Sequence, residues 1–331
     1  MDFFLPMADN THPPSILDHA LRARTALPLL LALALVPTLF NLAGEGFYIS
    51  VASRILIFAL AATSLNLILG FGGMVSFGHA AFVGMGAYTV GILMQSGVVS
   101  AWVSWPAAFV VGGVFALLIG LISLRTQGVY FIMITLAFAQ MLFYLMVSLK
   151  PYGGEDGLSL ASRSHLGLGL NLADDAQFYY VVLALVAVLF FGVAKLLNAR
   201  FGHALQGIRE NETRMAALGF AVYRTKLVAF TLAGAIAGLA GALLANQASF
   251  VSPALLQWSQ SGMLMIMVIL GGVGYLWGGL VGAAAFLLIE EVLVAYTIHW
   301  QFGLGAVLLA VVLLSPNGLL SLLGKFRRKP A

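Results

Sequence analysis

Residues 103–123 read VSWPAAFVVGGVFALLIGLIS, a run without a single charged side chain. A transmembrane helix needs about 20 consecutive apolar residues to cross the hydrocarbon core of a bilayer. Comparable runs recur along the chain, and of its 331 residues 61% are hydrophobic and only 8% are charged. A soluble domain carries about 25% charged residues, because its surface must be hydrated. The composition therefore predicts an integral membrane protein.

The pattern within these runs selects the type of membrane fold. Strands of a membrane β-barrel alternate apolar and polar residues over about ten positions, whereas the runs here are continuous. We therefore expect an all-α, polytopic integral membrane protein with about ten transmembrane helices. The expected spans are 27–43, 49–70, 79–96, 103–123, 128–148, 178–198, 226–246, 261–275, 277–297 and 302–322. Glycines interrupt the third, eighth and ninth of these, so any of them could be a half-helix or a re-entrant segment.

The basic residues predict the orientation, because Lys and Arg concentrate in cytoplasmic segments. Only Arg54, Lys150 and Arg163 fall at or near the outer face when the N-terminus is placed in the cytoplasm. The other basic residues lie at or near the inner face: Arg22, Arg24, Arg125, Lys195, Arg200, Arg209, Arg214, Arg224, Lys226, Lys325, Arg327, Arg328 and Lys329. Both termini are thus expected in the cytoplasm. Because the charges follow the membrane faces, we expect membrane lipid and not nucleic acid as their partner.

This topology divides the chain into three parts. Residues 1–24 form a cytoplasmic N-terminal tail, 25–323 the transmembrane domain, and 324–331 a basic cytoplasmic C-terminal tail. Two long loops interrupt the transmembrane domain. The loop 150–177 is rich in Gly and Asp and lies outside, in the periplasm, and the loop 199–226 lies inside.

The inner loop, ARFGHALQGIRENETRMAALGFAVYRTK, contains a candidate amphipathic helix at Ala204–Leu218. Its apolar positions Leu205, Ile208, Met215 and Leu218 would lie near one face. A helix this polar cannot enter lipid. It is either a surface connector whose arginines contact anionic headgroups or an element that docks into a partner protein.

Two Gly-rich interruptions resemble each other. LGFGGMVSFG at 69–78 and LGGVGYLWGG at 270–279 share one Leu and three Gly positions at a constant offset. Gly-rich interruptions at corresponding places in two halves of a transporter point to its transport pathway, although common membrane residues could also match by chance.

Four stretches together identify a family. IRENETRMAALGF at 208–220 resembles the cytoplasmic coupling loop of the branched-chain amino acid permease family, in which a short helix docks into the ATPase subunit. LNLILGFGGMVSFGHAAFVGMGAY at 65–88 resembles the Gly-rich segment of that family, and LRTQGVYFIMITLAFAQM at 124–141 is similar to its LivM-type member. GGVGYLWGGLVGA at 271–283 resembles the late Gly-rich segment, with Tyr275 where a smaller residue is more usual.

The resemblance implies the fold of the large-importer ABC permeases in the bacterial inner membrane. It also implies a transporter complex of several subunits. A second related permease, two cytoplasmic ATPase subunits and a periplasmic solute-binding protein are the implied partners. It implies branched-chain or related amino acids as substrates. By the same resemblance, the ATPase-coupling residues are Arg209, Glu210, Asn211, Glu212 and Arg214, and the candidate residues of the translocation pathway are Asn66, Ser76, Gly78, His79, Tyr88, Thr135 and Gln140.

Lone polar residues within membrane helices have a second interpretation, because they can also hydrogen-bond neighbouring helices. Asn66, Thr135 and Gln140 are of this kind, and His79 could bond a nearby carbonyl. No metal site is expected at His79, because no second His or carboxylate stands three or four residues further on.

The sequence predicts neither a catalytic residue nor a bound cofactor. It contains no cysteine, no H-E-x-x-H and no G-x-S-x-G motif, which argues against a membrane-bound enzyme. The nearest match to a phosphate-binding loop, Gly318 to Lys325, has the wrong spacing and is followed by Phe326. ATP and Mg²⁺ are therefore expected in the partner subunits.

Two alternatives remain open. An ABC permease of this type could instead carry urea, amides or aromatic acids. The chain could also be a stand-alone secondary transporter or channel, with Glu290 or Glu291 in the ninth span coupling transport to protons. Adjacent helix positions point about 100° apart, so these two carboxylates do not form an acid–base pair. They could equally cap helices or meet a partner near the outer interface.

Overall fold

The computed structural model describes residues 23–42, 44, 46–167, 169–314 and 318–320. The expected tails at 1–24 and 324–331 lie outside the described residues, except that residues 23 and 24 begin the first helix. In the described part of the chain, each expected span coincides with one helix. These helices are α1 (Ala23–Leu42), α2 (Phe47–Asn66), α3 (His79–Gln95), α4 (Ala101–Ser123), α5 (Val129–Ser148), α6 (Asp175–Leu197), α9 (Val222–Ala248), α10 (Trp258–Gly271), α11 (Gly278–Tyr296) and α12 (Trp300–Leu314).

Short elements complete the fold. The π-helical turn η2 (Leu67–Phe71) extends α2, and the 3₁₀ turns η3 (Lys150–Tyr152) and η4 (Pro253–Leu256) lie in loops. The inner loop holds α7 (Arg200–Glu210) and α8 (Glu212–Ala217). The described residues form an all-α fold apart from a two-residue antiparallel pair between β1 (Leu158–Ser159) and β2 (Phe250–Val251) and two isolated bridges, Ser100 with His165 and Gly167 with Leu170.

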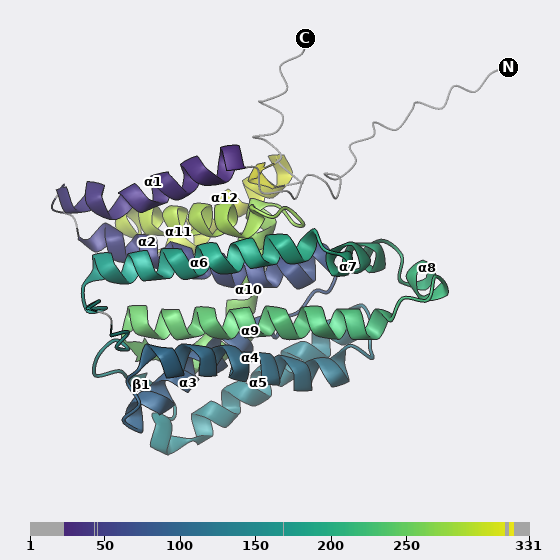
Figure 1. Cartoon of the computed structure of the whole chain (residues 1–331), viewed down its shortest axis with the longest axis horizontal. Helices are drawn as coiled ribbons and strands as arrows, with labels where there is room; N and C mark the ends of the chain where they lie inside the picture. The colour runs from purple at the N-terminus through teal and green to yellow at the C-terminus, as the bar shows by residue number, and fades with distance from the viewer. Residues whose placement is uncertain (1–22, 43, 45, 168, 315–317, 321–331) are drawn as a thin grey trace, which may run out of the picture.

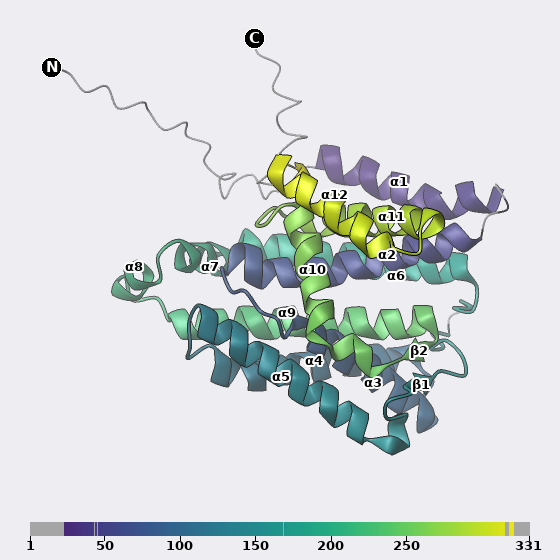
Figure 2. The same ribbon diagram turned by 180° about the vertical axis from the view of Figure 1, so that it is seen from behind.

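Six of the described helices are long and apolar enough to cross a membrane: α2 with η2, α4, α5, α6, α9 and α11. The helix α10 has 14 residues, about 21 Å at 1.5 Å per residue, which is less than the ~30 Å hydrocarbon core. It also lies across the direction of α2, α6 and α9 (Figure 2). The eighth expected span is therefore not confirmed as a crossing, and neither are the first, third and tenth, whose helices α1, α3 and α12 are not among the six. The glycines that interrupt the third and the eighth had marked both as possible half-helices or re-entrant segments.

The helices form two groups. α3, α4, α5 and α9 pack together on one side, and α1, α2, α6, α11 and α12 pack on the other (Figure 1). α2 contacts α9 across the boundary, and α10 bridges α11 and α2 to α3. The inner and outer loops lie at opposite ends of the bundle (Figure 1), which we name the α7 end and the β1 end.

Glycines allow the closest helix contacts in the first group. A methyl group placed on Gly86 of α3 would lie 1.9 Å from the carbonyl oxygen of Gly238 on α9. One on Gly112 of α4 would lie 2.6 Å from the carbonyl oxygen of Gly234. Lipid tails are as apolar as helix surfaces, so membrane helices associate through such close packing rather than through the hydrophobic effect.

The loop 150–177 at the β1 end is held by one arginine. The side chain of Arg163 donates hydrogen bonds to the carbonyl of Asn246 (3.1 Å), the carbonyl of Leu172 (2.9 Å) and the Asp175 carboxylate (2.6 Å). Its guanidinium also lies over the Phe178 ring, 4.7 Å from the centroid. These contacts join the loop to the last turn of α9 and the first turns of α6.

Replacing Arg163 with alanine should therefore free this loop while leaving the bundle intact. Loss of three hydrogen bonds, one to a charged partner, costs at least 1.5 kcal/mol or so, and a local opening made 1.4 kcal/mol easier is about tenfold more populated. We expect proteinase K to cleave purified Arg163→Ala within 150–177 about ten times faster than the unmutated chain. Lys150→Ala, an exposed residue of the same loop, is the matched control, and equal cleavage of both variants would contradict the prediction.

Candidate functional site

The first Gly-rich segment breaks the chain between α2 and α3. α2 continues into η2 and ends at Phe71, Gly73 takes a positive φ of 67°, and the chain then runs without helix to His79. The amide of Met74 donates to the carbonyl of Ile68 at 2.8 Å, which turns the chain back toward the bundle. α3 begins there, with Gly78 against the Thr135 carbonyl of α5.

The second Gly-rich segment makes a similar break between α10 and α11. α10 ends at Gly271, and Gly272 and Gly274 take positive φ values of 120° and 80°. α11 then starts at Gly278. This segment is interrupted at the place where the sequence pattern predicts it.

The two breaks lie against each other. A methyl group placed on Gly70 would lie 2.5 Å from the backbone nitrogen of Gly274, so Gly70 leaves no room for a side chain at this contact. Asn66 joins them from α2: its Nδ2 donates to the Tyr275 carbonyl at 2.8 Å, and its Oδ1 accepts from the Gly274 amide at 3.0 Å. The correspondence of the two Gly-rich segments thus marks a physical junction. We call Asn66, Gly70, Gly73, Gly274 and Tyr275 the break junction.

The inner loop differs from the expected single helix at Ala204–Leu218. It forms two helices, because Asn211 has an extended backbone (φ −157°, ψ 99°) and its side chain accepts from the Arg214 amide at 2.8 Å, capping α8. The prediction that the four apolar residues of this loop lie near one face is also wrong in part. Leu205 and Ile208 on α7 are buried, but Leu218 is 66% exposed.

The five expected coupling residues separate into two groups. Glu210, Asn211 and Arg214 are exposed, and α8 extends beyond the neighbouring helices at the α7 end (Figure 1). Glu212 forms an ion pair with Lys226 in the first turn of α9, at 2.5 Å. Arg209 is exposed as well, but the end of its side chain reaches the bundle, where Nη1 donates to the Gly70 carbonyl in the break junction.

The expected pathway residues lie mostly inside the bundle. Ser76, His79, Tyr88 and Thr135 are at most 1% exposed. His79 Nε2 lies 2.8 Å from Ser64 Oγ of α2. The next residue, Ala80, donates its amide to Ser261 Oγ of α10 at 2.9 Å. The start of α3 is thus tied to both α2 and α10 through two serines that the sequence analysis did not single out.

Four of the expected pathway residues differ in their hydrogen bonds or in their exposure. Thr135 Oγ1 donates to the Ile132 carbonyl within α5. Tyr88 Oη and His79 Nδ1 are buried without a hydrogen-bond partner among the described residues. Gln140 is half-buried on α5, and its position next to the surface distinguishes it from the others.

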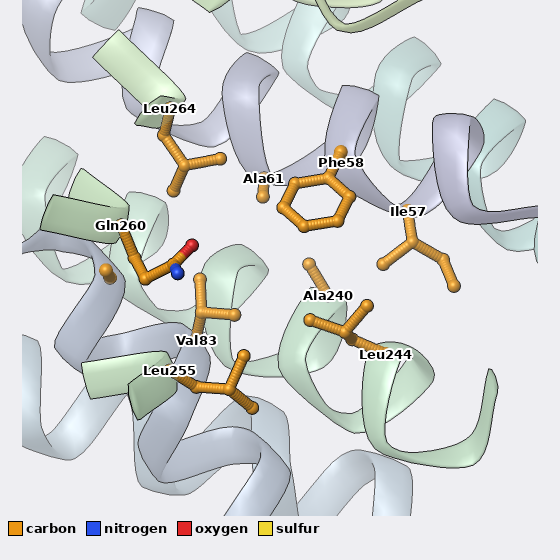
Figure 3. A pocket seen from close by; sticks show the side chains of 10 residues that line it. Ile57, Phe58, Ala61, Val83, Ala240, Leu244, Leu255, Gln260 and Leu264 are labelled. Atoms are coloured by element: carbon orange, nitrogen blue, oxygen red, sulfur yellow. The ribbon is translucent and has the colours of Figure 1, made fainter. Parts of the chain in front are cut away.

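An apolar hollow lies between α2, α3, α9, η4 and α10 (Figure 3). Its free volume is about 20 Å³, which is room for about one water molecule. Its lining is apolar apart from one amide, and Figure 3 shows the Gln260 amide pointing among the surrounding side chains of Phe58, Val83 and Leu255. The side chains around it are therefore closely packed, with Gln260 as their one polar group.

A second hollow of about 280 Å³ opens at the α7 end. It lies between Gly73–Val75, the turn from α4 to α5 and the ion pair of Glu212 with Lys226. This charged pair distinguishes it from the apolar hollow inside the bundle. The first hollow reaches the start of α3 at Ala80, and the second reaches the break junction at Gly73.

The described residues contain no group of three or more His, Cys, Asp or Glu side chains that could hold a metal ion. An ion pair that the sequence analysis missed lies elsewhere: Arg54 Nη2 of α2 is 3.6 Å from Glu290 Oε1 of α11. Such a pair between helices 236 positions apart has no signature in hydropathy.

Comparisons with known proteins agree on one kind of protein. A family model described as "Branched-chain amino acid transport system / permease component" matches residues 47–314. The high-affinity branched-chain amino acid transport system permease protein LivM of Salmonella typhimurium is 28% identical over 295 residues, which cover 82% of this chain and 69% of LivM. The probable branched-chain amino acid transport permease protein LivH of Methanocaldococcus jannaschii is 27% identical over 266 residues, or 74% of this chain and 82% of LivH.

A third relative is named for a different substrate. The autoinducer 2 import system permease protein LsrC of Klebsiella pneumoniae is 34% identical over 141 residues, covering 39% of this chain and 40% of LsrC. No solved structure gave a significant match.

Proposed function

Because this chain belongs to the branched-chain amino acid transport system permease family, we propose that it is the LivM-type permease half of an ATP-driven importer. It pairs with a second related permease, receives solute from a periplasmic binding protein, and couples to two cytoplasmic ATPase subunits that bind ATP and Mg²⁺. The α7 end faces the cytoplasm of a bacterium and the β1 end the periplasm, with both termini inside. The distribution of basic residues supports this orientation.

One observation carries the coupling role. α8 carries the exposed Arg214, follows the exposed Glu210 and Asn211, and projects from the α7 end, and none of its own residues is buried. A helix that contributes so little to its own bundle is suited to bind in a cleft of another protein. Helix-in-groove docking of this kind uses charged rim contacts for register and specificity.

The mechanism that follows is alternating access. The loaded binding protein docks at the β1 end, over the loop 150–177, and ATP binding in the partners moves α7 and α8. The pathway between the two permeases then changes its exposure, with the bias supplied by the difference in nucleotide affinity between the two states.

Branched-chain or related amino acids are the proposed substrates. The family match and the LivM and LivH relatives support this class. The name of the LsrC relative shows that related permeases carry other cargo. We therefore assign the final choice of substrate to the binding protein.

Charge reversal on α8 tests the coupling role. Purification of the tagged chain from its native host in mild detergent should recover two ATPase subunits and a second permease, identified by mass spectrometry. In Arg214→Glu we expect recovery of the ATPase to fall at least tenfold, since loss of a charged interface contact costs about 2 kcal/mol or more.

Lys150→Glu is the matched control, because it makes the same charge change at an exposed residue of the opposite end. Its complex should be recovered in full. Recovery of the unmutated chain alone, in a detergent that keeps comparable complexes intact, would refute the assignment and favour a stand-alone transporter.

A further inference from the structure

Arg209 reaches from the coupling segment into the break junction. We propose that it is a positioning residue that transmits the movement of α7 to both Gly-rich breaks and does not itself bind the ATPase. This inference rests on the proposed function, because it assumes that an ATPase moves α7. It separates Arg209 from Arg214, although both are arginines of the same loop.

The first step is that α7 rests on the first break. Leu205 and Ile208 are buried on the inner face of α7, and a methyl group on Gly72 would lie 3.4 Å from Leu205 Cδ1. Arg209 lies one turn after Leu205 and next to Ile208, at the edge of this buried face. A displacement of α7 therefore cannot leave the break unaffected.

The second step is that Arg209 spans both breaks. Its Cα, Cβ and Cγ pass over Gly73: a methyl group there would lie 3.7, 3.6 and 3.1 Å from them. Its Nη1 donates to the Gly70 carbonyl and would lie 3.0 Å from a methyl group on Gly274. One side chain thus contacts the segment after α2 and the segment after α10.

The third step explains why the residue is an arginine. The last four carbonyls of a helix lack partners within the helix, and Gly70 lies in the last turn of η2. Helix C-termini attract positive charge, so the end of η2 favours a cation at this place. Arginine combines the needed reach with a permanent charge and several donors in a fixed plane.

The fourth step is that the two breaks move as one body. Asn66 bonds to Gly274 and Tyr275 at once, and Gly70 is in backbone contact with Gly274. A push or pull on Gly70 by Arg209 therefore reaches the start of α11 as well as the end of η2. The start of α3, tied to α2 by His79 and to α10 by Ser261, follows both.

Three variants of the assembled transporter test this proposal in proteoliposomes with the binding protein and its amino acid. In Arg209→Ala we expect full recovery of the ATPase, ATP hydrolysis within twofold of the unmutated complex, and uptake reduced at least tenfold. Arg209→Lys keeps the charge and should restore part of the uptake. Arg214→Glu should instead lose the ATPase itself.

Several outcomes would overturn the proposal. One is uptake in Arg209→Ala at the rate of the unmutated complex. Another is loss of the ATPase from Arg209→Ala to the extent seen in Arg214→Glu, since that loss would make Arg209 a docking residue. Failure of the proposed function appears separately, as absence of the ATPase from the unmutated chain. If Arg209→Ala does not fold, Arg209→Lys takes its place. Normal assembly with reduced uptake per ATP hydrolysed then supports the link, and uptake equal to that of the unmutated complex contradicts it.

A distance measurement separates transmission from simple support of the fold. The chain contains no cysteine, so spin labels attach only at introduced sites, and His203 of α7 and Val273 of the second break are both exposed. In His203→Cys/Val273→Cys we expect one distance that stays the same with and without nucleotide. With Arg209→Ala added, the distance should change when ATP binds. A nucleotide-dependent distance in the presence of Arg209 would disprove a rigid link.

Discussion

Replacing Gly241 with leucine is expected to abolish the folded chain. Gly241 lies in α9, and a methyl group on it would lie 1.8 Å from the Val83 carbonyl oxygen and 3.0 Å from the Ala87 amide nitrogen of α3. Carbon atoms pack at about 3.5–4.0 Å, so α3 and α9 would have to separate by more than 1 Å or so. The obstacle is backbone, which cannot turn away as a side chain can.

Separating α3 from α9 should strongly destabilise the protein, because α9 lies at the centre of the helix contacts. This helix of 27 residues packs against α2, α3 and α4, and close packing holds membrane helices together in the absence of a hydrophobic drive between them. Overpacking a core by one or two methylenes already costs about 1–3 kcal/mol, and leucine adds four heavy atoms at a backbone contact.

Size-exclusion chromatography and thermal unfolding in detergent would measure the effect. We expect at least a tenfold lower yield of monodisperse Gly241→Leu, or a fall in Tm of more than about 10 °C. Gly192→Leu is the matched control, since Gly192 is a helical glycine of α6 with no atom within 4 Å of an added methyl group. Equal Tm values for the two variants would show that the α3–α9 contact is not what holds these helices.

Hydropathy predicted where the helices lie because span length and apolarity are local properties. Each expected span has a helix in the described residues, with ends that differ by a few positions, except that the expected end of the tenth span at 322 lies outside the described residues. Hydropathy could not predict direction. α10 is as apolar as its neighbours, yet it lies across them (Figure 2), because its orientation depends on contacts with α2, α3 and α11 far away in sequence.

In the inner loop, the sequence analysis missed the break between α7 and α8 and the partner of Arg209. Asn211 is a strong N-cap type, and Asn followed by Glu-Thr-Arg predicts a helix start that splits the expected single helix. For Arg209, the resemblance of residues 208–220 to the coupling loop of the permease family implied a contact with the ATPase. Its spacing of four from the buried Leu205 placed it at the edge of the inner face, but nothing in the sequence specified Gly70 as its acceptor.

Part of the site was predictable because some of its residues are conspicuous in the local sequence. The Gly-rich breaks and Asn66 stand out as interruptions of apolar helices, and the structure joins them. The bonds from Ser64 to His79 and from Ser261 to Ala80 were not predictable, since serines are common in membrane helices. Their partners are known only once α2, α3 and α10 are placed in space.

Arg54 and Glu290 decide between the importer and a stand-alone transporter. The Glu290 side chain is only 13% exposed and pairs with Arg54 at 3.6 Å, while its other oxygen has no hydrogen-bond partner among the described residues. A carboxylate that couples transport to protons must exchange them during the cycle. A carboxylate that serves structure needs only its partner, and both can then be replaced together.

We therefore expect opposite results from single and double replacement. Arg54→Met leaves the Glu290 charge buried and unpaired, which costs about 3–5 kcal/mol for a fully buried pair and less here, because Arg54 is 39% exposed. A loss of about 2 kcal/mol should lower Tm by several degrees. Arg54→Met/Glu290→Leu removes both charges, and replacing an ion pair with apolar residues is often neutral or stabilising, so Tm should recover.

Uptake in the double variant is the decisive measurement. An importer driven by ATP should keep at least half of its uptake in Arg54→Met/Glu290→Leu, because neither charge takes part in the coupling that we propose. Glu291→Leu, at the neighbouring half-buried carboxylate, controls for the loss of a negative charge from α11. If the double variant folds with normal Tm but loses uptake while Glu291→Leu transports, Glu290 exchanges protons in the cycle. Transport would then depend on an ion gradient, and the ATPase would no longer be needed to explain it.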